Sequence, residues 1–212
     1  MNTIVDLTLN YTNAFTGFSK EVSRSIEKDG WNASILTFYS HCGTHMDAPI
    51  HFNVSNQTID KISVSDFVGK AWVIDVREIG SKGLLHSNHI PKKILEKFSK
   101  GDSLIFWTGW SQYVNTSKYR DELPRISEEL ALWCLENKVK MIGVEPPSVA
   151  DVNNLKEVTK IHQILLKGVV IIEGLTNIEA IQSNCVELIA LPLKIADGDG
   201  APARVIAIEK YK

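Results

Sequence analysis

The sequence predicts an α/β fold, because short apolar strands alternate along the chain with helical segments. The chain has 212 residues, of which 44% are hydrophobic and 23% are charged, as in an ordinary globular protein. Folding a chain of this size buries roughly 70% of its surface, so one sizeable core is feasible. No repeat or linker divides the chain, and we therefore expect a single domain over residues 1–212.

The first predicted strand is residues 3–9, where β-branched residues alternate with polar ones at several positions. Residues 10–30 are polar and mixed in character, and we expect loops there. Short apolar runs predict further strands, at residues 34–39, 71–76, 103–107, 141–144 and 169–172.

Three helices are expected between these strands. Residues 91–100 follow the rule that proline is favoured at the first helical position, and residues 127–138 carry two glutamates in their first turn. Residues 158–167 precede Gly168, a residue type that often ends a helix. Together the elements predict a mixed sheet with flanking helices.

Charge and hydropathy exclude several classes of function. The formal net charge of −2 offers no basic field for nucleic acid or an anionic membrane surface. No apolar run approaches the roughly 18 residues of a membrane span. Three cysteines favour thiols in a reducing compartment over a disulfide framework, and the first residues do not resemble a signal peptide. We therefore expect a cytoplasmic protein.

Histidines cluster in one short segment. Three of the six lie within residues 41–51, where an even spread would place about 0.3. His41 and His45 are four residues apart, and Asp47 could complete a facial set of two imidazoles and one carboxylate that suits Zn, Mn or Fe(II). Three protein ligands leave a position open for water, as in catalytic metal sites.

The alternative is that these side chains form a hydrogen-bonded core network or a surface tract without metal. The apolar neighbours of the segment, such as Phe38 and Phe52, favour burial. Packing several unpaired polar groups there would cost about 1–3 kcal/mol each, so the spacing favours a metal site.

The segment from His41 to Phe52 reads H-C-G-T-H-M-D-A-P-I-H-F and resembles a long motif of the metal-dependent cyclase family, which contains bacterial kynurenine formamidases and isatin hydrolases. Further resemblances run along nearly the whole chain. They are the Thr108-Gly109-Trp110 element, the segments 143–150, 162–166 and 172–175, and the Asp199-Gly200-Ala201-Pro202-Ala203-Arg204 stretch. The resemblance implies a swivelling β/β/α fold and a homo-oligomer, either a homodimer or a homotetramer.

The resemblance also implies a ligand set. His41, His45 and Asp47 would hold one divalent ion, and Asp47 would bridge to a second ion held by His162 and Glu173. Zinc is the first metal expected and manganese the alternative. Without the family, His162 would be a half-buried packing residue and Glu173 a surface charge at a strand end.

The implied activity is hydrolysis of an amide of a small aromatic substrate by metal-bound hydroxide, with His51 as general acid/base. The first substrate to test is an N-formyl aryl amine such as N-formylkynurenine. A lactam hydrolase similar to isatin hydrolase is the alternative within enzymes, and a non-catalytic metal- or ligand-binding protein is the alternative of another class.

Two aromatic residues are candidates for the substrate pocket, Phe15 and Trp110, although ordinary packing is an equal explanation for Trp110. Residues 11–18 depart from the proline-containing segment of many family members, which leaves the substrate open. Glu145 also stands where the family commonly has Asp. The Asp197–Gly200 segment lacks the ligand positions of a calcium loop and is interpreted as a turn.

Overall fold

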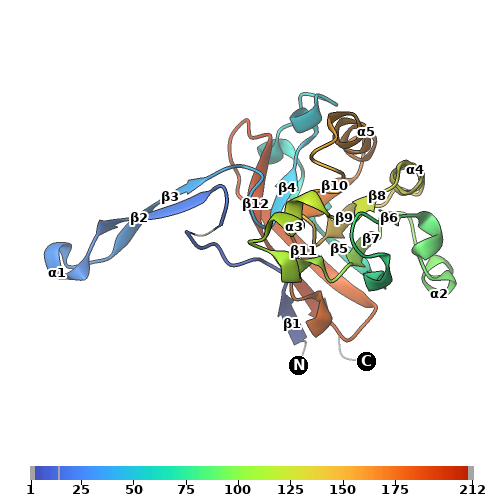
Figure 1. The fold of residues 1–212 in the computed structure, drawn as a ribbon, viewed down its shortest axis with the longest axis horizontal. Helices are drawn as coiled ribbons and strands as arrows, with labels where there is room; N and C mark the ends of the chain where they lie inside the picture. The colour runs from blue at the N-terminus through green and yellow to red at the C-terminus, as the bar shows by residue number, and fades with distance from the viewer. Residues whose placement is uncertain (1–2, 14, 210–212) are drawn as a thin grey trace.

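The structure is a computed structural model that describes residues 3–13 and 15–209. Its centre is a mixed sheet that curves round on itself (Figure 1). In the order of hydrogen bonding its strands are β1 (Thr3–Asp6), β12 (Gly200–Glu209), β11 (Cys185–Pro192), β5 (Val68–Asp75), β7 (Ser103–Trp107), β9 (Met141–Val144), β10 (Val170–Glu173) and β4 (His45–Asp47).

The sheet closes because β4 pairs with both β10 and β12. Seven strands of the described chain form the resulting ring, and β1 pairs with the far end of β12. Strands β5, β7, β9 and β10 run parallel to their neighbours in this set, and the remaining pairings are antiparallel. Closure leaves β4 without a free edge and fixes its register on both sides.

The ring separates two apolar cores. Met46, Ile105, Ile172 and Leu188 are among the fully buried side chains of the inner core. The outer core lies between the parallel strands and the helices, and Phe106 and Leu165 belong to it. Because side chains alternate across a strand, one strand feeds both cores.

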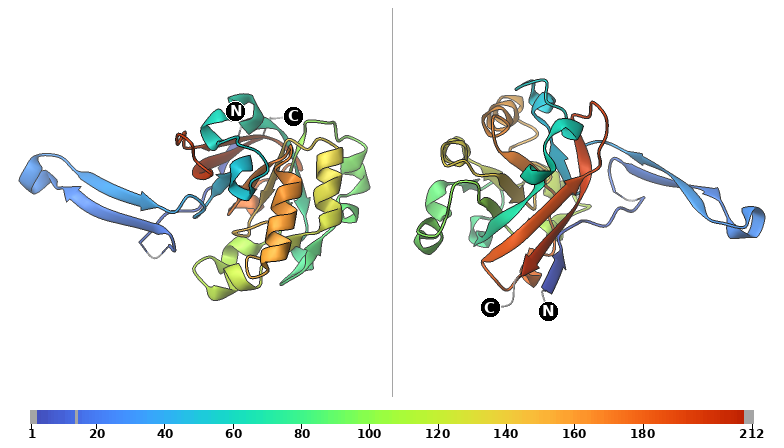
Figure 2. Two further views of the ribbon diagram at one scale, coloured as in Figure 1. Left: turned by 90° about the horizontal axis from the view of Figure 1, so that it is seen from above. Right: turned by 180° about the vertical axis from the view of Figure 1, so that it is seen from behind.

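The helices pack on the outer face of the parallel strands. In Figure 2, α4 (Glu128–Glu136) and α5 (Leu155–Leu165) lie side by side. Each is capped at its start, since the Ser127 hydroxyl accepts from the Leu130 N–H and the Asn154 side chain accepts from the Glu157 N–H. Two shorter helices, α2 (Lys92–Leu95) and α3 (Ser117–Asp121), and a small parallel sheet of β6 (Leu84–Leu85) and β8 (Arg125–Ile126) complete this side.

A long hairpin projects away from the body (Figures 1 and 2). It consists of β2 (Phe18–Arg24), the single-turn helix α1 (Ile26–Asp29) and β3 (Ala33–Phe38). We call residues 18–38 the arm. Along both strands nearly every residue is exposed. The exposed residues of the arm include large apolar ones, namely Val22, Ile26, Trp31, Ile35 and Leu36.

The predicted α/β class and mixed sheet are confirmed, and strands 103–107 and 141–144 have the predicted bounds. Residues 10–13 and 15–17 are loops and turns as expected, but the loops do not extend over the whole of 10–30, because residues 18–24 form β2 and residues 26–29 form α1. The helix predicted over 91–100 is only the short α2, while α5 begins three residues before the predicted residue 158. The single domain over residues 1–212 stays a prediction, and residues 1–2, 14 and 210–212 lie outside the described part. No helix among the described residues is long and apolar enough to cross a membrane.

Candidate metal centre

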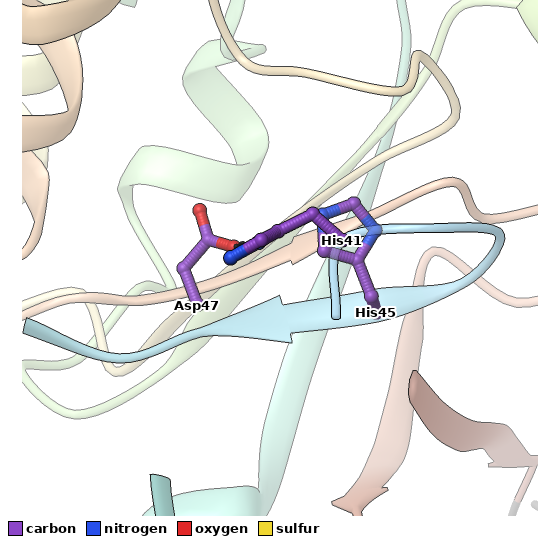
Figure 3. A group of neighbouring side chains, drawn as sticks. All are labelled: His41, His45 and Asp47. Carbon is purple, nitrogen blue, oxygen red and sulfur yellow. Dashed lines mark hydrogen bonds and ion pairs between the residues drawn. The ribbon is translucent and has the colours of Figure 1, made fainter. Parts of the chain in front are cut away.

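Strand β4 places His45 and Asp47 on the same outer face of the ring, since residues two apart on a strand share a face. Met46 between them points into the inner core and is fully buried. His41 precedes the strand in a turn, and Figure 3 shows its imidazole lying with His45 and Asp47 on one side of β4. The predicted convergence of these three side chains is therefore present.

The turn before β4 is stabilised by hydrogen bonds of Tyr11 and Thr44, a role that the sequence did not indicate for either residue. The Tyr11 hydroxyl lies 2.9 Å from the Cys42 carbonyl oxygen and 3.0 Å from that of Thr44. The Thr44 hydroxyl donates to the Gly174 carbonyl and accepts from the Leu9 N–H. These contacts join the turn to the N-terminal segment and to the end of β10.

Glycine is required where the turn crosses the end of β10. Gly174 has φ +69°, and a Cβ there would lie 2.3 Å from the Gly43 carbonyl oxygen. This close approach brings Glu173, the preceding residue, directly opposite His45 in the β4–β10 register.

Helix α5 contributes His162 to the centre. The side chain of His162 is buried and faces Asp47 and Glu173, whose carboxylates lie beside it. The five residues expected as ligands therefore lie together, although His162 and Glu173 are far from the histidine motif in the sequence.

Each of the two carboxylates lies between His162 and the histidines of the motif. Asp47 lies between His162 and the pair His41 and His45, and Glu173 lies between His162 and His45. Asp47 Oδ1 is 2.8 Å from His41 Nδ1 and 3.7 Å from His45 Nε2, while its Oδ2 is 3.5 Å from His162 Nε2. Glu173 Oε2 is 3.1 Å from His45 Nε2, and Oε1 is 3.4 Å from His162 Nε2. This arrangement fits the expectation that Asp47 bridges two ions. Glu173 likewise contacts both His45 and His162, which the sequence did not suggest.

The ligand atoms fall into two clusters of a size that suits a metal ion. His41, His45 and Asp47 form one, and Asp47, His162 and Glu173 form the other, with all ligand atoms of each cluster within 4.8 Å of one another. Asp47 Oδ2 is buried and has no hydrogen-bond partner among the described residues. An unpaired buried carboxylate oxygen is costly, so this atom fits a divalent ion.

The second nitrogens of the imidazoles are also consistent with metal binding. His45 Nδ1 is 3.0 Å from the Gly43 carbonyl oxygen, and His162 Nδ1 is 2.7 Å from the Val158 carbonyl oxygen. A carbonyl acceptor fixes the proton on Nδ1 and leaves Nε2 as the free ligand atom. Each Nε2 is the atom that faces the carboxylates.

Mutual attraction controls the ionisation of the metal-free centre. Burial lowers the pKa of His41, but the hydrogen bonds and negative charges of Asp47 and Asp199 outweigh it and raise that pKa to about 9. The pKa values of His45 and His162 are also raised, because the attraction of the neighbouring carboxylates outweighs the lowering effect of burial. Burial raises the pKa of Asp47, but its histidine neighbours hold it below the usual range.

His51 behaves in the opposite way. It lies in the short 3₁₀ helix Pro49–Phe52, with its ring stacked on that of His41 at a centroid distance of 3.8 Å. Burial, assisted by the charges of His41 and His162, lowers its pKa from the ordinary value of 6.5. A neutral imidazole beside the metal cluster can accept a proton near pH 7.

The two candidate substrate contacts differ in exposure. Phe15 is half-buried, and its ring lies 5.9 Å from that of Tyr11. Trp110 is 3% exposed, packs with Tyr119 and donates its indole N–H to the Tyr119 carbonyl. Its burial favours the packing explanation, because a buried Trp110 has almost no surface that a substrate could contact.

Glu145, the residue that follows β9, is fully buried and has a structural role. Its carboxylate accepts hydrogen bonds from the main chain and hydroxyl of Thr108, from the Gly109 N–H and from the Ser111 hydroxyl. The resemblance did not indicate this role, which holds the 108–111 loop against the end of β9.

One acidic residue near the centre was missed from the sequence. Asp199 lies in the segment before β12, and its Oδ2 is 3.1 Å from His41 Nε2. Residues 196–197 form a turn and residue 199 a bend, as expected for this segment, while Gly200 begins β12. Asp199 opens the 199–204 segment that carries the family resemblance, but neither the turn nor the resemblance indicated that its carboxylate faces a histidine 158 positions earlier.

The closed mixed sheet and the convergent His, Asp and Glu side chains define an α/β protein with a candidate dinuclear metal centre. A family model described as "Putative cyclase" matches residues 5–151, and the chain belongs to this family. The expected cyclase-family fold is thereby confirmed.

Relatives and solved structures agree with this assignment. The chain is 34% identical over 192 residues to a kynurenine formamidase from Bacillus thuringiensis (strain Al Hakam), covering 90% of this chain and 87% of the relative. It is 32% identical to a kynurenine formamidase from Bacillus anthracis, with the same coverage. Isatin hydrolase A from Labrenzia aggregata superposes with a TM-score of 0.88 at 24% identity, covering 99% of this chain and 94% of the other.

Proposed function

We propose that this chain is a metal-dependent amide hydrolase that cleaves an N-formyl aryl amine such as N-formylkynurenine to the free aryl amine and formate. The observation that carries the proposal is the pair of ligand clusters that share Asp47, with an ionisable His51 beside them. The kynurenine formamidase relatives at 32–34% identity support the substrate class. The isatin hydrolase structures are below 25% identity, so they support the fold and do not favour lactam cleavage.

The ligands proposed for the first ion are His41, His45 and Asp47, and those for the second are Asp47, His162 and Glu173. Divalent metal, zinc first and manganese second, supplies a Lewis acid that activates water and polarises the amide carbonyl when bound. Asp47 and Glu173 supply the negative charge that balances the ions in a buried site.

His51 is the proposed general acid/base. Its lowered pKa keeps the ring neutral near pH 7, so it can take the proton from the attacking water. The same proton then passes to the leaving aryl nitrogen, which departs as a neutral amine. Phe15 remains a candidate contact for the aromatic ring of the substrate, and Trp110 would contribute only if its packing changed.

The test is a substrate screen on the metal-loaded protein. N-formylkynurenine, formanilide and isatin are supplied in turn with Zn²⁺ or Mn²⁺, and release of aryl amine or ring-opened product is followed by absorbance. We expect turnover of the two formamides and a metal content of two ions per chain by elemental analysis. Less than one bound ion per chain at saturating metal would contradict the dinuclear proposal.

We also propose a homodimer in which the arm of each copy packs on the other copy. An isolated two-stranded hairpin is marginally stable in water, and this arm exposes Val22, Ile26 and Trp31 by 75%, 63% and 58%. The body has its own exposed apolar group at the end of β11 and just after it, formed by Leu191, Leu193 and Ile195. In a twofold-symmetric dimer the arm of each copy would pack on the body of the other, so both arms would be covered at once.

A cytoplasmic location remains part of the proposal. Cys42 and Cys134 are buried thiols without a disulfide, which suits a reducing compartment.

A further inference from the structure

Asp199 is a half-exposed carboxylate at the edge of the metal centre that the proposed reaction does not use. Its Oδ2 lies 3.1 Å from His41 Nε2, while His41 Nδ1 lies 2.8 Å from Asp47 Oδ1. The two nitrogens of one imidazole therefore face two different carboxylates. Asp47 belongs to the ligand cluster, and Asp199 is on the far side of the ring.

His41 differs from the other two proposed histidine ligands in this respect. The second nitrogens of His45 and His162 lie beside main-chain carbonyls, which a substitution cannot remove. The second nitrogen of His41 faces the side chain of Asp199. A carboxylate in this place fixes the tautomer and the ring orientation of a metal-binding histidine and makes it a better ligand.

The position of Asp199 is set by the closed sheet. Its carbonyl accepts from the N–H of Ala48, the residue that follows Asp47, and Gly200 is paired with Asp47 in the β4–β12 register. A Cβ at Gly200 would lie 2.6 Å from His41 Cε1, so the main chain also contacts the ring. The carboxylate is thus placed by paired strands although its tip is exposed.

We propose that Asp199 is a positioning residue, which accepts the Nε2–H of His41 and so directs the Nδ1 lone pair toward the ion shared with Asp47. This inference rests on the proposed metal-dependent function. His51 lies in the same arrangement, because its ring stacks on His41 at 3.8 Å with an interplanar angle of 22°. Its Nδ1 is 3.8 Å from Asp199 Oδ2, too long for a hydrogen bond, so Asp199 acts on His51 through the His41 ring.

A direct metal ligand is the competing role, since His41, His51 and Asp199 also form a cluster of suitable size. Two observations favour positioning. His41 already directs Nδ1 toward the buried cluster, and an ion on the other side would take His51 as a ligand and remove the proposed acid/base group.

The experiment compares Asp199→Ala and Asp199→Asn with the full-length parent chain. Asn keeps a side-chain acceptor for Nε2–H but loses the charge, whereas Ala loses both. Asp197→Asn is the matched control, because Asp197 is exposed in the same loop and its φ of +54° is tolerated by Asn. Zinc affinity is measured by chelator competition, the number of ions by elemental analysis at saturating zinc, and kcat and KM with N-formylkynurenine.

We expect Asp199→Ala to weaken zinc binding about 10–100-fold for one of the two ions, and Asp199→Asn to weaken it less. At saturating zinc both variants bind as many ions as the parent, and kcat falls while KM changes little. Asp197→Asn matches the parent in all measurements.

Three results overturn the inference while leaving the proposed function intact. They are one ion fewer at saturating zinc, which makes Asp199 a ligand; unchanged zinc affinity in Asp199→Ala; and a lower melting temperature without a change in affinity or kcat. A parent chain that binds no zinc would instead refute the proposed function together with the inference.

Discussion

At the scale of single residues, the centre separates groups that hold metal from the group that moves a proton. The carboxylates raise the pKa values of His41, His45 and His162, whereas burial lowers that of His51. Opposite shifts within a few ångströms indicate different surroundings. The three ligand histidines face carboxylates, where a bound ion would replace the proton, whereas His51 is neutral near pH 7 without a metal.

Replacement of His51 by Ala should remove turnover and leave the metal in place. We expect kcat to fall about 10²–10⁴-fold, the usual contribution of a general acid/base, with two ions still bound. Product release and elemental analysis check the two parts separately. His86→Ala is the control, since His86 is a half-exposed histidine outside the centre. A rate for His51→Ala equal to that control would remove the proposed role.

Replacement of Glu173 by Gln should weaken metal binding at both clusters. The side chain keeps its size, but the oxygen pair that faces His45 and His162 loses its charge and half of its acceptor capacity. We expect at least a tenfold loss of zinc affinity, measured by chelator competition. Parent-like affinity would show that Glu173 serves the fold through its bond from the Val149 N–H and is not a ligand.

At the scale of elements, local patterns predicted the strands that are apolar on both faces. Residues 104–107 and 141–144 are runs without a polar side chain, and the strands 103–107 and 141–144 are largely buried with the predicted bounds. The second strand of the arm, β3, was predicted at residues 34–39. Its partner β2 was missed because neither of its faces is covered within its own chain, so polar residues such as Lys20 and Glu21 give no alternation.

The closure of the sheet could not be predicted from local sequence patterns either. It depends on β4 pairing with β12, where Asp47 is opposite Gly200 across more than half of the chain. Separation along the sequence also explains why only part of the site could be predicted from local patterns. The motif from His41 to His51 could be identified from local spacing, whereas His162 and Glu173 required the family resemblance. Asp199 also lies in a segment that carries the resemblance, but its contact with His41 became visible only in the folded chain.

The crossing between the histidine turn and β10 should be intolerant of any side chain at Gly174. Gly174→Ala would combine a positive φ with a Cβ 2.3 Å from the Gly43 carbonyl oxygen, so Glu173 and His45 must separate. Gly101→Ala is the control, because Gly101 has φ +94° with no atom within 4 Å of the added Cβ. We expect about 1 kcal/mol lost in the control and clearly more in Gly174→Ala, measured by denaturant unfolding, with loss of bound zinc only in the latter. Equal costs would mean that the contact with Gly43 relaxes freely.

At the scale of the whole molecule, the arm should control assembly. Trp31→Ser with Ile35→Ser removes two large apolar side chains that are 58% and 59% exposed in the single chain, so the fold of the body should be unaffected. We expect the parent to sediment as a dimer and the double variant as a monomer with parent-like zinc content. Lys20→Ser with Glu21→Ser is the polar control on the same hairpin and should remain dimeric. A monomeric parent chain would contradict the proposed exchange of arms.

The stability of the metal-free protein should fall as pH rises above neutrality. The pKa of His41 is raised from 6.5 to about 9, so its contribution is complete below pH 6.5 and is lost as pH rises through 9. This loss is roughly 3 kcal/mol, and His45 and His162 shift in the same direction. Asp47 and Glu173 have lowered pKa values, so their contribution is present above their ordinary pKa and is lost in acid.

The metal-free centre therefore contributes most between about pH 4.5 and 6.5. Zinc should reverse the trend above this window, because protons no longer compete for the imidazoles and metal binding strengthens with pH. Urea unfolding of chelator-treated and zinc-loaded protein at pH 6, 7.5 and 9 measures both curves. His41→Gln should flatten the metal-free curve, because it removes the raised pKa of His41. A metal-free protein whose stability rises from pH 6 to 9 would contradict the charge arrangement, since it would mean that the buried carboxylates do not hold protons on these imidazoles.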